Sequence, residues 1–244
     1  MNNSIQVISI VNLMLAFIPV LVVIGILYKF SLEYRNGLYA VSRMLVQLLL
    51  IGYFLAYIFK ANKAWIVIVV LAVMVFASGW IALRTIKVHR WILYKKSILS
   101  ISIGGGITLI LITQGVLQLI PWYWPQYMIP LAGMIFANAM NSISLAADRI
   151  EAEAVRGVQY EQARAIAFRA SLIPITNSLF AVGLVSLPGM MTGQILSGIS
   201  PLIAARYQIM VMCMIYGSAG ISSAIFLILI KPQIHALFYD VKAK

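Results

Sequence analysis

Long apolar runs constrain the fold of this chain more than any other feature of its sequence. A helix needs about 20 apolar residues to cross the hydrocarbon core of a bilayer, and seven stretches approach or reach that length. A soluble fold of 244 residues could not bury them all, since 63% of the residues are hydrophobic and only 10% are charged. The sequence therefore predicts an all-α polytopic membrane protein with about seven transmembrane helices. The predicted spans are Ile8–Tyr28, Arg43–Phe59, Ala64–Leu83, Ser97–Ile120, Tyr127–Ala147, Leu172–Leu187 and Tyr207–Ile230.

The Lys and Arg residues are distributed unevenly between the predicted loops. With seven spans and the N-terminus outside, all but three of the 18 basic residues fall on the cytoplasmic side, the exceptions being Lys60, Lys63 and Arg206. Basic residues concentrate in cytoplasmic loops, so we expect the C-terminus to be cytoplasmic. We expect the protein itself to lie in the inner (plasma) membrane. The net charge of +12 then reflects contact with the lipid bilayer and does not indicate nucleic-acid binding.

The uncharged stretch over residues 170–205 is too long for one span and short for two. Pro188 and Gly189 interrupt it, because Pro and Gly together break helices. We expect a broken helix or re-entrant segment near 188–205. An eighth span over Met190–Ala205 is the alternative, although it weakens the charge bias between the two sides.

The segment Asp148–Arg169 carries four acidic residues and four arginines interspersed with alanines, which favours a helix outside the bilayer. Its Glu-Ala-Glu, followed after three residues by Gly, partly matches the EAA-x3-G coupling pattern of ABC importers. In those proteins a cytoplasmic helix of the membrane subunit docks into the ATPase subunit. A generic charged loop helix explains the same residues equally well. The residues assigned to ATPase coupling are Glu151, Glu153, Arg156, Gly157 and Arg164.

The chain contains no GxxxxGK[ST] phosphate-binding loop. Gly104-Gly105-Gly106 lies within a predicted span and is followed by Ile-Thr-Leu, so no lysine could reach a phosphate. We expect the glycines to permit close helix approach. We also expect the chain to bind no cofactor of its own, with ATP held by a partner subunit.

Polar residues within the spans are candidates for a substrate path, because polar groups in a bilayer are costly and often functional. Asn138 and Asn141 share a helix face with Met134, and the broken segment suits a gate. The alternative is that these side chains only pack or hydrogen-bond between helices. The residues assigned to the path or gate are Met134, Asn138, Met140, Asn141, Pro188, Gly189, Met190, Met191, Thr192, Gly193 and Gln194.

Arg43 and Gln47 lie one turn apart near the start of the second span and are assigned to a cytoplasmic mouth. The alternative is that Arg43 only extends its charge to the lipid headgroups. No metal ligand can be assigned. No Asp or Glu falls within a predicted span, so a desolvated cation would meet only amide, hydroxyl, carbonyl and thioether groups.

The stretch VGLVSLPGMMTGQI, residues 182–195, together with Tyr207-Gln208-Ile209, resembles the FetB-type permease family. These proteins are the membrane subunits of ABC transporters ascribed to iron export, with plant relatives linked to aluminium tolerance. Further matching pieces are Arg43 with Gln47 and Gly52, Ala132–Ile135 with Asn138-Ala139-Met140, and Pro174 with Asn177-Ser178.

This resemblance covers about residues 40–230, with departures at Ala137 and over Arg156–Gln159. It implies a single transmembrane permease domain over residues 1–244 and a homodimer of permeases with two cytoplasmic ABC ATPase subunits. The implied function is the membrane subunit of an ABC transporter that exports a metal such as iron.

Two other functions are weighed against an ABC permease. An ATP-independent secondary carrier or channel would favour intramembrane ionisable residues or inverted repeats, and neither is evident. A membrane enzyme would need clustered His, Asp or Cys. The chain has two distant histidines, His89 and His235, and the single cysteine Cys213.

Overall fold

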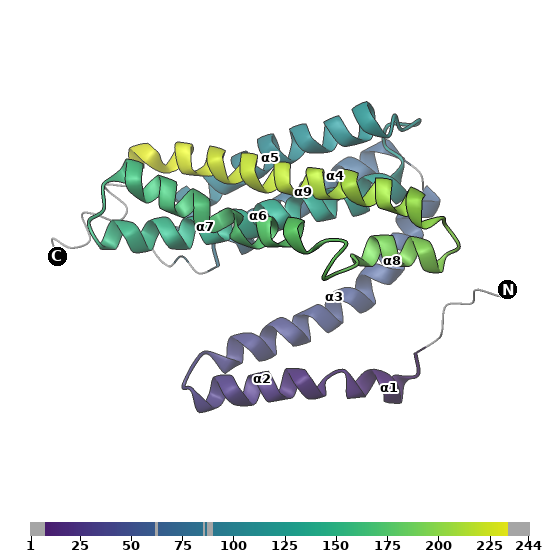
Figure 1. Ribbon diagram of the computed structural model, residues 1–244, viewed down its shortest axis with the longest axis horizontal. Coiled ribbons are helices and arrows are strands. Elements are labelled where there is room, and N and C mark those ends of the chain that lie inside the picture. Colours follow the sequence, from purple (N-terminus) through teal and green to yellow (C-terminus); the bar gives the residue numbers. More distant parts are fainter. Residues whose placement is uncertain (1–7, 62, 85, 87–89, 234–244) are drawn as a thin grey trace. The chain divides into compact units, whose positions relative to one another are not determined.

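The computed structural model describes residues 8–61, 63–84, 86 and 90–233, and every regular element within these ranges is a helix (Figure 1). This confirms the all-α fold. The chain forms two compact units. The first comprises Met1–Ala61 with Leu196–Gly198, and the second comprises Asn62–Ile195 with Ile199–Lys244.

The first unit is a helical hairpin with a short leading helix. Ser9 caps its first helix, since its hydroxyl accepts a hydrogen bond from Asn12 N at 3.2 Å. The two long helices approach each other at Gly37, where a Cβ would lie 3.5 Å from Leu27 Cδ1. Their apolar side chains are almost all exposed within this chain, which leaves a large surface for lipid or another subunit. The helices are α1 (Ile10–Leu15), α2 (Ile18–Lys29) and α3 (Tyr34–Ala61).

The second unit is a bundle in which α6, α7 and α9 lie side by side (Figure 1). The core is formed by apolar side chains of α4, α5, α6, α7 and α9. Pro begins both α6 and α9, a position where its missing N–H costs nothing. The elements are α4 (Ala64–Ala82), α5 (Arg90–Ile110), the π-helix η1 (Leu111–Val116), α6 (Pro125–Val155), α7 (Tyr160–Ala181), α8 (Gly189–Leu196), α9 (Pro201–Ile230) and the 3-10 helix η2 (Lys231–Gln233).

Two members of the glycine triplet in α5 are contact points between helices, as the sequence predicted. A Cβ at Gly104 would lie 2.5 Å from Ser222 Oγ and 2.8 Å from Ser222 N on α9. A Cβ at Gly105 would lie 2.9 Å from the ring of Phe136 on α6. A Cβ at Gly106 would meet nothing within 4 Å. Small residues at such contacts let membrane helices pack closely.

Within the described residues, six helical segments are long and apolar enough to cross a membrane, against about seven predicted. The difference lies at the predicted span Leu172–Leu187. Its residues up to Ala181 belong to α7, which begins at Tyr160 and carries charged residues in its first half, and the remainder forms a loop. The six segments are Ile10–Lys29, Tyr34–Lys60, Ala64–Ala82, Arg90–Val116, Pro125–Val155 and Pro201–Ile230.

The break predicted at Pro188 is confirmed. Residues 182–188 are not helical, and α8 then runs only from Gly189 to Leu196. Eight residues are too few to cross the hydrocarbon core, so an eighth span over Met190–Ala205 does not form. The helix α9 begins at Pro201, six residues before the predicted start of the final span at Tyr207.

Candidate functional site

A cavity of about 350 Å³ lies between α8 and the helices α6, α7 and α9 of the second unit. It collects side chains from four helices and from the loop between α7 and α8. None of the described residues that line it is charged. They are Met134 and Asn138 of α6, Ser178 of α7, Val182, Ser186 and Pro188 of the loop, Gly189 and Met190 of α8, and Gln208, Val211, Met212 and Ile215 of α9.

The α7–α8 loop forms one wall of this cavity because its backbone folds back on the end of α7. The carbonyl of Ala181 accepts hydrogen bonds from Val185 N at 2.8 Å and Ser186 N at 3.1 Å. Gly183 has a φ of 82°, a conformation that side chains with a Cβ rarely adopt. Pro188 then ends the loop, and its carbonyl accepts the Thr192 hydroxyl at 3.1 Å in the first turn of α8.

The polar lining of the cavity consists of amide and hydroxyl side chains. The amide group of Asn138 donates through Nδ2 to the Met134 carbonyl at 2.9 Å, and the Ser178 hydroxyl donates to the Pro174 carbonyl at 3.0 Å. Backbone oxygens thus accept one amide hydrogen of Asn138 and the hydroxyl hydrogen of Ser178. Gln208 is only 5% exposed, and its buried Oε1 has no hydrogen-bond partner among the described residues. An unpaired buried acceptor is costly, so this oxygen is a candidate ligand-binding group.

The structure brings together five of the residues assigned to the path or gate. Met134 and Asn138 contribute from α6, Pro188 from the end of the loop, and Gly189 and Met190 from the start of α8. Asn141 is exposed and does not line the cavity, since it lies about 10 Å along the α6 axis from Met134 although on nearly the same face. The assigned residues that do not line the cavity are Met140, Asn141, Met191, Thr192, Gly193 and Gln194.

Sequence reasoning missed the contribution of α9. Gln208 and Met212 both line the cavity and lie one turn apart on that helix. A glutamine inside a 30-residue apolar helix was the available signal, since a polar group at that depth needs a partner or a function. Ser178 and Ser186 were missed for a different reason, because both fall in the predicted span Leu172–Leu187 and small hydroxyl residues are common in membrane spans.

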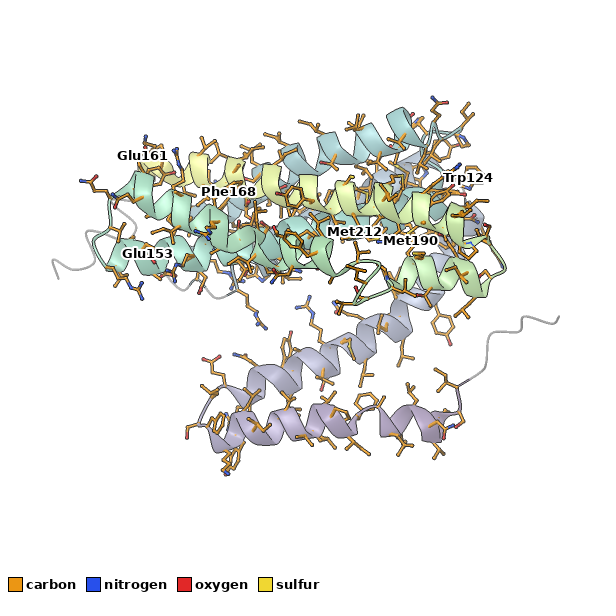
Figure 2. The ribbon with its side chains drawn as sticks, in the orientation of Figure 1. Trp124, Glu153, Glu161, Phe168, Met190 and Met212 are labelled. Atoms are coloured by element: carbon orange, nitrogen blue, oxygen red, sulfur yellow. The ribbon has the colours of Figure 1, made fainter. Side chains whose placement is uncertain are left out.

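The other end of α7, away from the cavity, follows a turn with charged residues, Arg156–Gln159 and its flanking helix ends, here named the charged turn. The turn between α6 and α7 is a Schellman motif, in which Val158 N bonds to the Glu153 carbonyl at 3.1 Å and Gly157 N to the Ala154 carbonyl at 2.9 Å. Gly157 has a φ of 81°. Figure 2 shows Glu153 at this end of the bundle and Met190 and Met212 toward the other.

Ion pairs fix this turn. Glu153 is 3% exposed, and its Oε1 lies 2.6 Å from Arg149 and 3.3 Å from Arg156. On α7, Glu161 pairs with Arg164 at 2.7 Å and with Lys231, which follows α9, at 2.8 Å. The hydrogen bond from Lys231, aided by the charge of Arg164, lowers the pKa of Glu161 below its usual value.

Tyr160 joins the same turn to α9. Its buried hydroxyl donates to the carbonyl of Leu227, near the C-terminal end of that helix. Burial raises the pKa of the Tyr160 phenol, so the hydroxyl stays protonated and keeps donating at neutral pH. The charged turn is therefore bonded to α9 both through Tyr160 and through Lys231.

The five residues assigned to ATPase coupling all lie at this turn, but the segment 148–169 is not one helix. It consists of the end of α6 and the start of α7, with Arg156–Gln159 between them. Glu153 is buried in ion pairs, whereas Arg156 and Gly157 are exposed. Glu151 is half-buried, and Arg164 lies on the first turns of α7.

The residues assigned to a cytoplasmic mouth, Arg43 and Gln47, are both exposed on α3 in the first unit. The cavity is built from residues of the second unit alone. His89 and His235 lie outside the described residues. Among the residues that the structure does describe, no three His, Cys, Asp or Glu side chains are grouped so that they could hold a metal ion.

Comparison with known proteins places these features in a family. Residues 10–235 match the model of the uncharacterised protein family UPF0014. A UPF0014 membrane protein of Synechocystis is 41% identical over 73% of this chain and 74% of its own length. The Escherichia coli protein named "Probable iron export permease protein FetB" is 37% identical over 89% of each chain.

A plant relative extends the match. The Arabidopsis thaliana protein named ALUMINUM SENSITIVE 3 is 32% identical over 93% of this chain and 88% of its own length. No solved structure matches the chain. The family match covers nearly all the described residues, and the helices described above fit membrane proteins of this kind. The chain therefore belongs to the UPF0014 family of membrane proteins.

Proposed function

We propose that this chain is the permease subunit of an ABC transporter that exports a metal, with ATP hydrolysed by a separate cytoplasmic subunit. The name of the Escherichia coli relative supports export as the activity and iron as one candidate substrate. The six candidate membrane spans support a permease. We place the chain in the inner (plasma) membrane as a multi-pass protein and as a homodimer.

The observation that carries the proposal is the position of α7. Its first residue, Tyr160, belongs to the charged turn, and Ser178 near its end lines the cavity. One helix thus connects a polar, ion-paired surface with an uncharged space among apolar helices. This is the arrangement that a transporter needs if an event outside the bilayer is to change a site within it.

The charged turn supports an ATPase-docking role. Arg156 and Gly157 are exposed at its tip, while the buried Glu153 and the bonds to α9 hold it in shape. A rigid tip transmits a displacement better than a flexible loop does, because the force is not lost in local deformation. The bias of basic residues toward this side of the predicted topology favours a cytoplasmic location.

Purification of the chain from native membrane with mild detergent tests this function. We expect an ATPase subunit to copurify, with vanadate-sensitive ATP hydrolysis. Replacing Gly157 by a bulky residue should leave the complex assembled but reduce transport per ATP. Retained transport by the chain alone, driven by an ion gradient without ATP, would contradict the proposal and favour an ATP-independent carrier or channel.

A further inference from the structure

We propose that the cavity binds a soft, monovalent metal cation of the Cu(I) type, through the thioethers of Met134, Met190 and Met212 and the amide oxygen of Gln208. This inference rests on the proposed export function and goes beyond it by naming the substrate class. It depends on the kinds of donor atoms in the cavity, on their free lone pairs and on the absence of charge in the lining.

The sulfur atoms come from three separate helices. Met134 lies on α6, Met190 on α8 and Met212 on α9, and all three side chains line the same cavity of about 350 Å³. Met190 and Met212 are labelled in Figure 2. Thioethers are soft ligands that favour Cu(I) over hard cations, which take carboxylate and water oxygens instead. Convergence from three helices is a stronger indication than three methionines along one helix, which packing alone would explain.

The polar groups of the lining include an acceptor that has no partner in the described part of the chain. One amide hydrogen of Asn138 and the hydroxyl hydrogen of Ser178 are directed to backbone carbonyls, which leaves the oxygen lone pairs of both groups able to accept or to ligate. Gln208 Oε1 is buried and has no hydrogen-bond partner among the described residues. A cation would supply the partner that this oxygen lacks, whereas an anion would not.

The absence of charge selects for a low ionic charge. None of the described lining residues is acidic, so nothing in the cavity neutralises a bound cation. The cost of moving an ion into a low-dielectric medium rises with the square of its charge, so a divalent ion costs about four times as much as a monovalent one. A bare Fe²⁺ or Al³⁺ ion would therefore be poorly bound, while Cu(I) combines a single charge with a preference for sulfur.

A second cavity suggests how such an ion would move. It has a volume of about 330 Å³ and is lined by a further methionine, Met210. Met134 and Met190 line both cavities, so their side chains stand between them. A cation held by thioethers in one cavity could therefore pass to the other without losing all its sulfur ligands. We assign Met134 and Met190 to this shared wall.

The test uses the full-length purified chain in lipid nanodiscs and Ag(I), a redox-stable probe with the charge and softness of Cu(I). Isothermal titration with Ag(I) should detect a site, and X-ray absorption of the bound ion should show sulfur neighbours. A triple Met→Leu variant removes the sulfurs with little change in volume, so the fold is expected to persist. The variant carries Met134→Leu, Met190→Leu and Met212→Leu.

A matched control removes three sulfurs outside both cavities, in Met14→Leu, Met44→Leu and Met74→Leu. We expect Ag(I) affinity to fall by about tenfold or more in the cavity variant, as when a metal site loses its supporting groups, and to be unchanged in the control. Gln208→Leu should weaken Ag(I) binding by a smaller factor, and it provides a second test if the triple variant does not fold.

Three results would overturn the inference: equal Ag(I) affinity in the wild-type chain and the cavity variant, a coordination shell without sulfur, or binding of Fe²⁺ that is tighter than that of Ag(I). The proposed function fails separately. A copurifying ATPase with no methionine-dependent Ag(I) site would retain the export role and remove the substrate class. Methionine-dependent Ag(I) binding without any ATPase would do the reverse.

Discussion

The two ends of α7 are each flanked by a glycine with the same backbone conformation, but the surrounding side chains are charged at one end and uncharged at the other. Gly157 has a φ of 81° just before the helix, and Gly183 has a φ of 82° just after it. Around Gly157, arginines pair with glutamates, and Tyr160 is bonded to α9. Around Gly183, the neighbouring Leu184 and Val185 are 90% and 86% exposed, and the loop is held mainly by backbone hydrogen bonds.

The comparison indicates that the position of the charged turn is fixed, while the uncharged end can change shape. The pair of Arg149 and Glu153 stabilises the end of α6, while Tyr160 and Glu161 bond the start of α7 to the C-terminal end of α9. The uncharged end borders a cavity and includes an unpaired buried oxygen on Gln208. A region that has few buried contacts and borders a cavity needs less free energy to open locally. A movement of α7 should therefore change the cavity more than it changes the charged turn.

The largest expected effect comes from removing the buried carboxylate of the charged turn. Glu153→Gln removes the charge that Arg149 and Arg156 share, and both arginines are partly exposed, so we expect the free energy of unfolding to fall by about 2 kcal/mol. Chemical denaturation of the detergent-solubilised chain measures it. Glu151→Gln is the matched control, since no ion pair involves that half-buried residue in the described structure. Equal effects of the two changes would show that the ion pairs do not hold the turn.

Substitution of the two glycines tests whether the shared backbone conformation has separate consequences. Gly157→Val and Gly183→Val should each lower the free energy of unfolding by about 1.5 kcal/mol, because both positions lie in the left-handed region. Asn tolerates that region, so Gly157→Asn and Gly183→Asn should cost less. With a partner ATPase present, Gly157→Val should reduce transport per ATP, whereas Gly183→Val should change substrate affinity. Identical functional defects would remove the distinction between the two ends.

A change at the cavity should have the opposite sign. Gln208→Leu removes a buried acceptor without a partner, so we expect the free energy of unfolding to rise by about 1 kcal/mol while transport falls. Denaturation and transport would be measured on the same preparation. Met212→Leu, one turn along α9, is the control for packing and should leave stability nearly unchanged. A loss of stability in Gln208→Leu would mean that the amide oxygen has a partner in the native protein.

The smallest effect concerns the exposed pair of Glu161 and Lys231. Because the pKa of Glu161 is lowered in the folded chain, its contribution to stability is full above the usual carboxyl value of 4.5. That contribution is lost as the pH falls through the lowered value. The Tm of the wild-type chain should therefore fall more than the Tm of Lys231→Met when the pH is lowered from neutral to about pH 3. Parallel curves for the two proteins would show that the pair contributes nothing.

Much of this fold could be predicted because each helix is specified by its own residues. Apolar runs gave most of the spans, and the Pro188–Gly189 step located the break before α8. The start of α7 at Tyr160 could not be found in this way. The first turns of α7 carry charged residues and its last turns are apolar. The sequence pattern therefore indicates two segments, although the backbone forms one continuous helix.

The candidate site was predicted only in part, because it depends on how helices are rotated against one another. Met134 and Asn138 share a face by spacing alone, and the structure confirms that both line the cavity. Spacing also grouped Asn141 with them, but that residue lies further along the axis of α6, is exposed and does not line the cavity. Gln208 reaches the cavity through the packing of α9, which local sequence does not determine.

The close approach of α5 and α9 limits the degrees of freedom available to a transport cycle. Gly104 admits Ser222 only because it has no side chain. A slide by one helical turn, about 5.4 Å, would bring Ser100 or Thr108 opposite Ser222, and each carries a Cβ that this space does not accommodate. We therefore expect α5 and α9 to tilt or rotate together about this contact as a fixed pivot, with any change in cavity volume arising from helices that move around it.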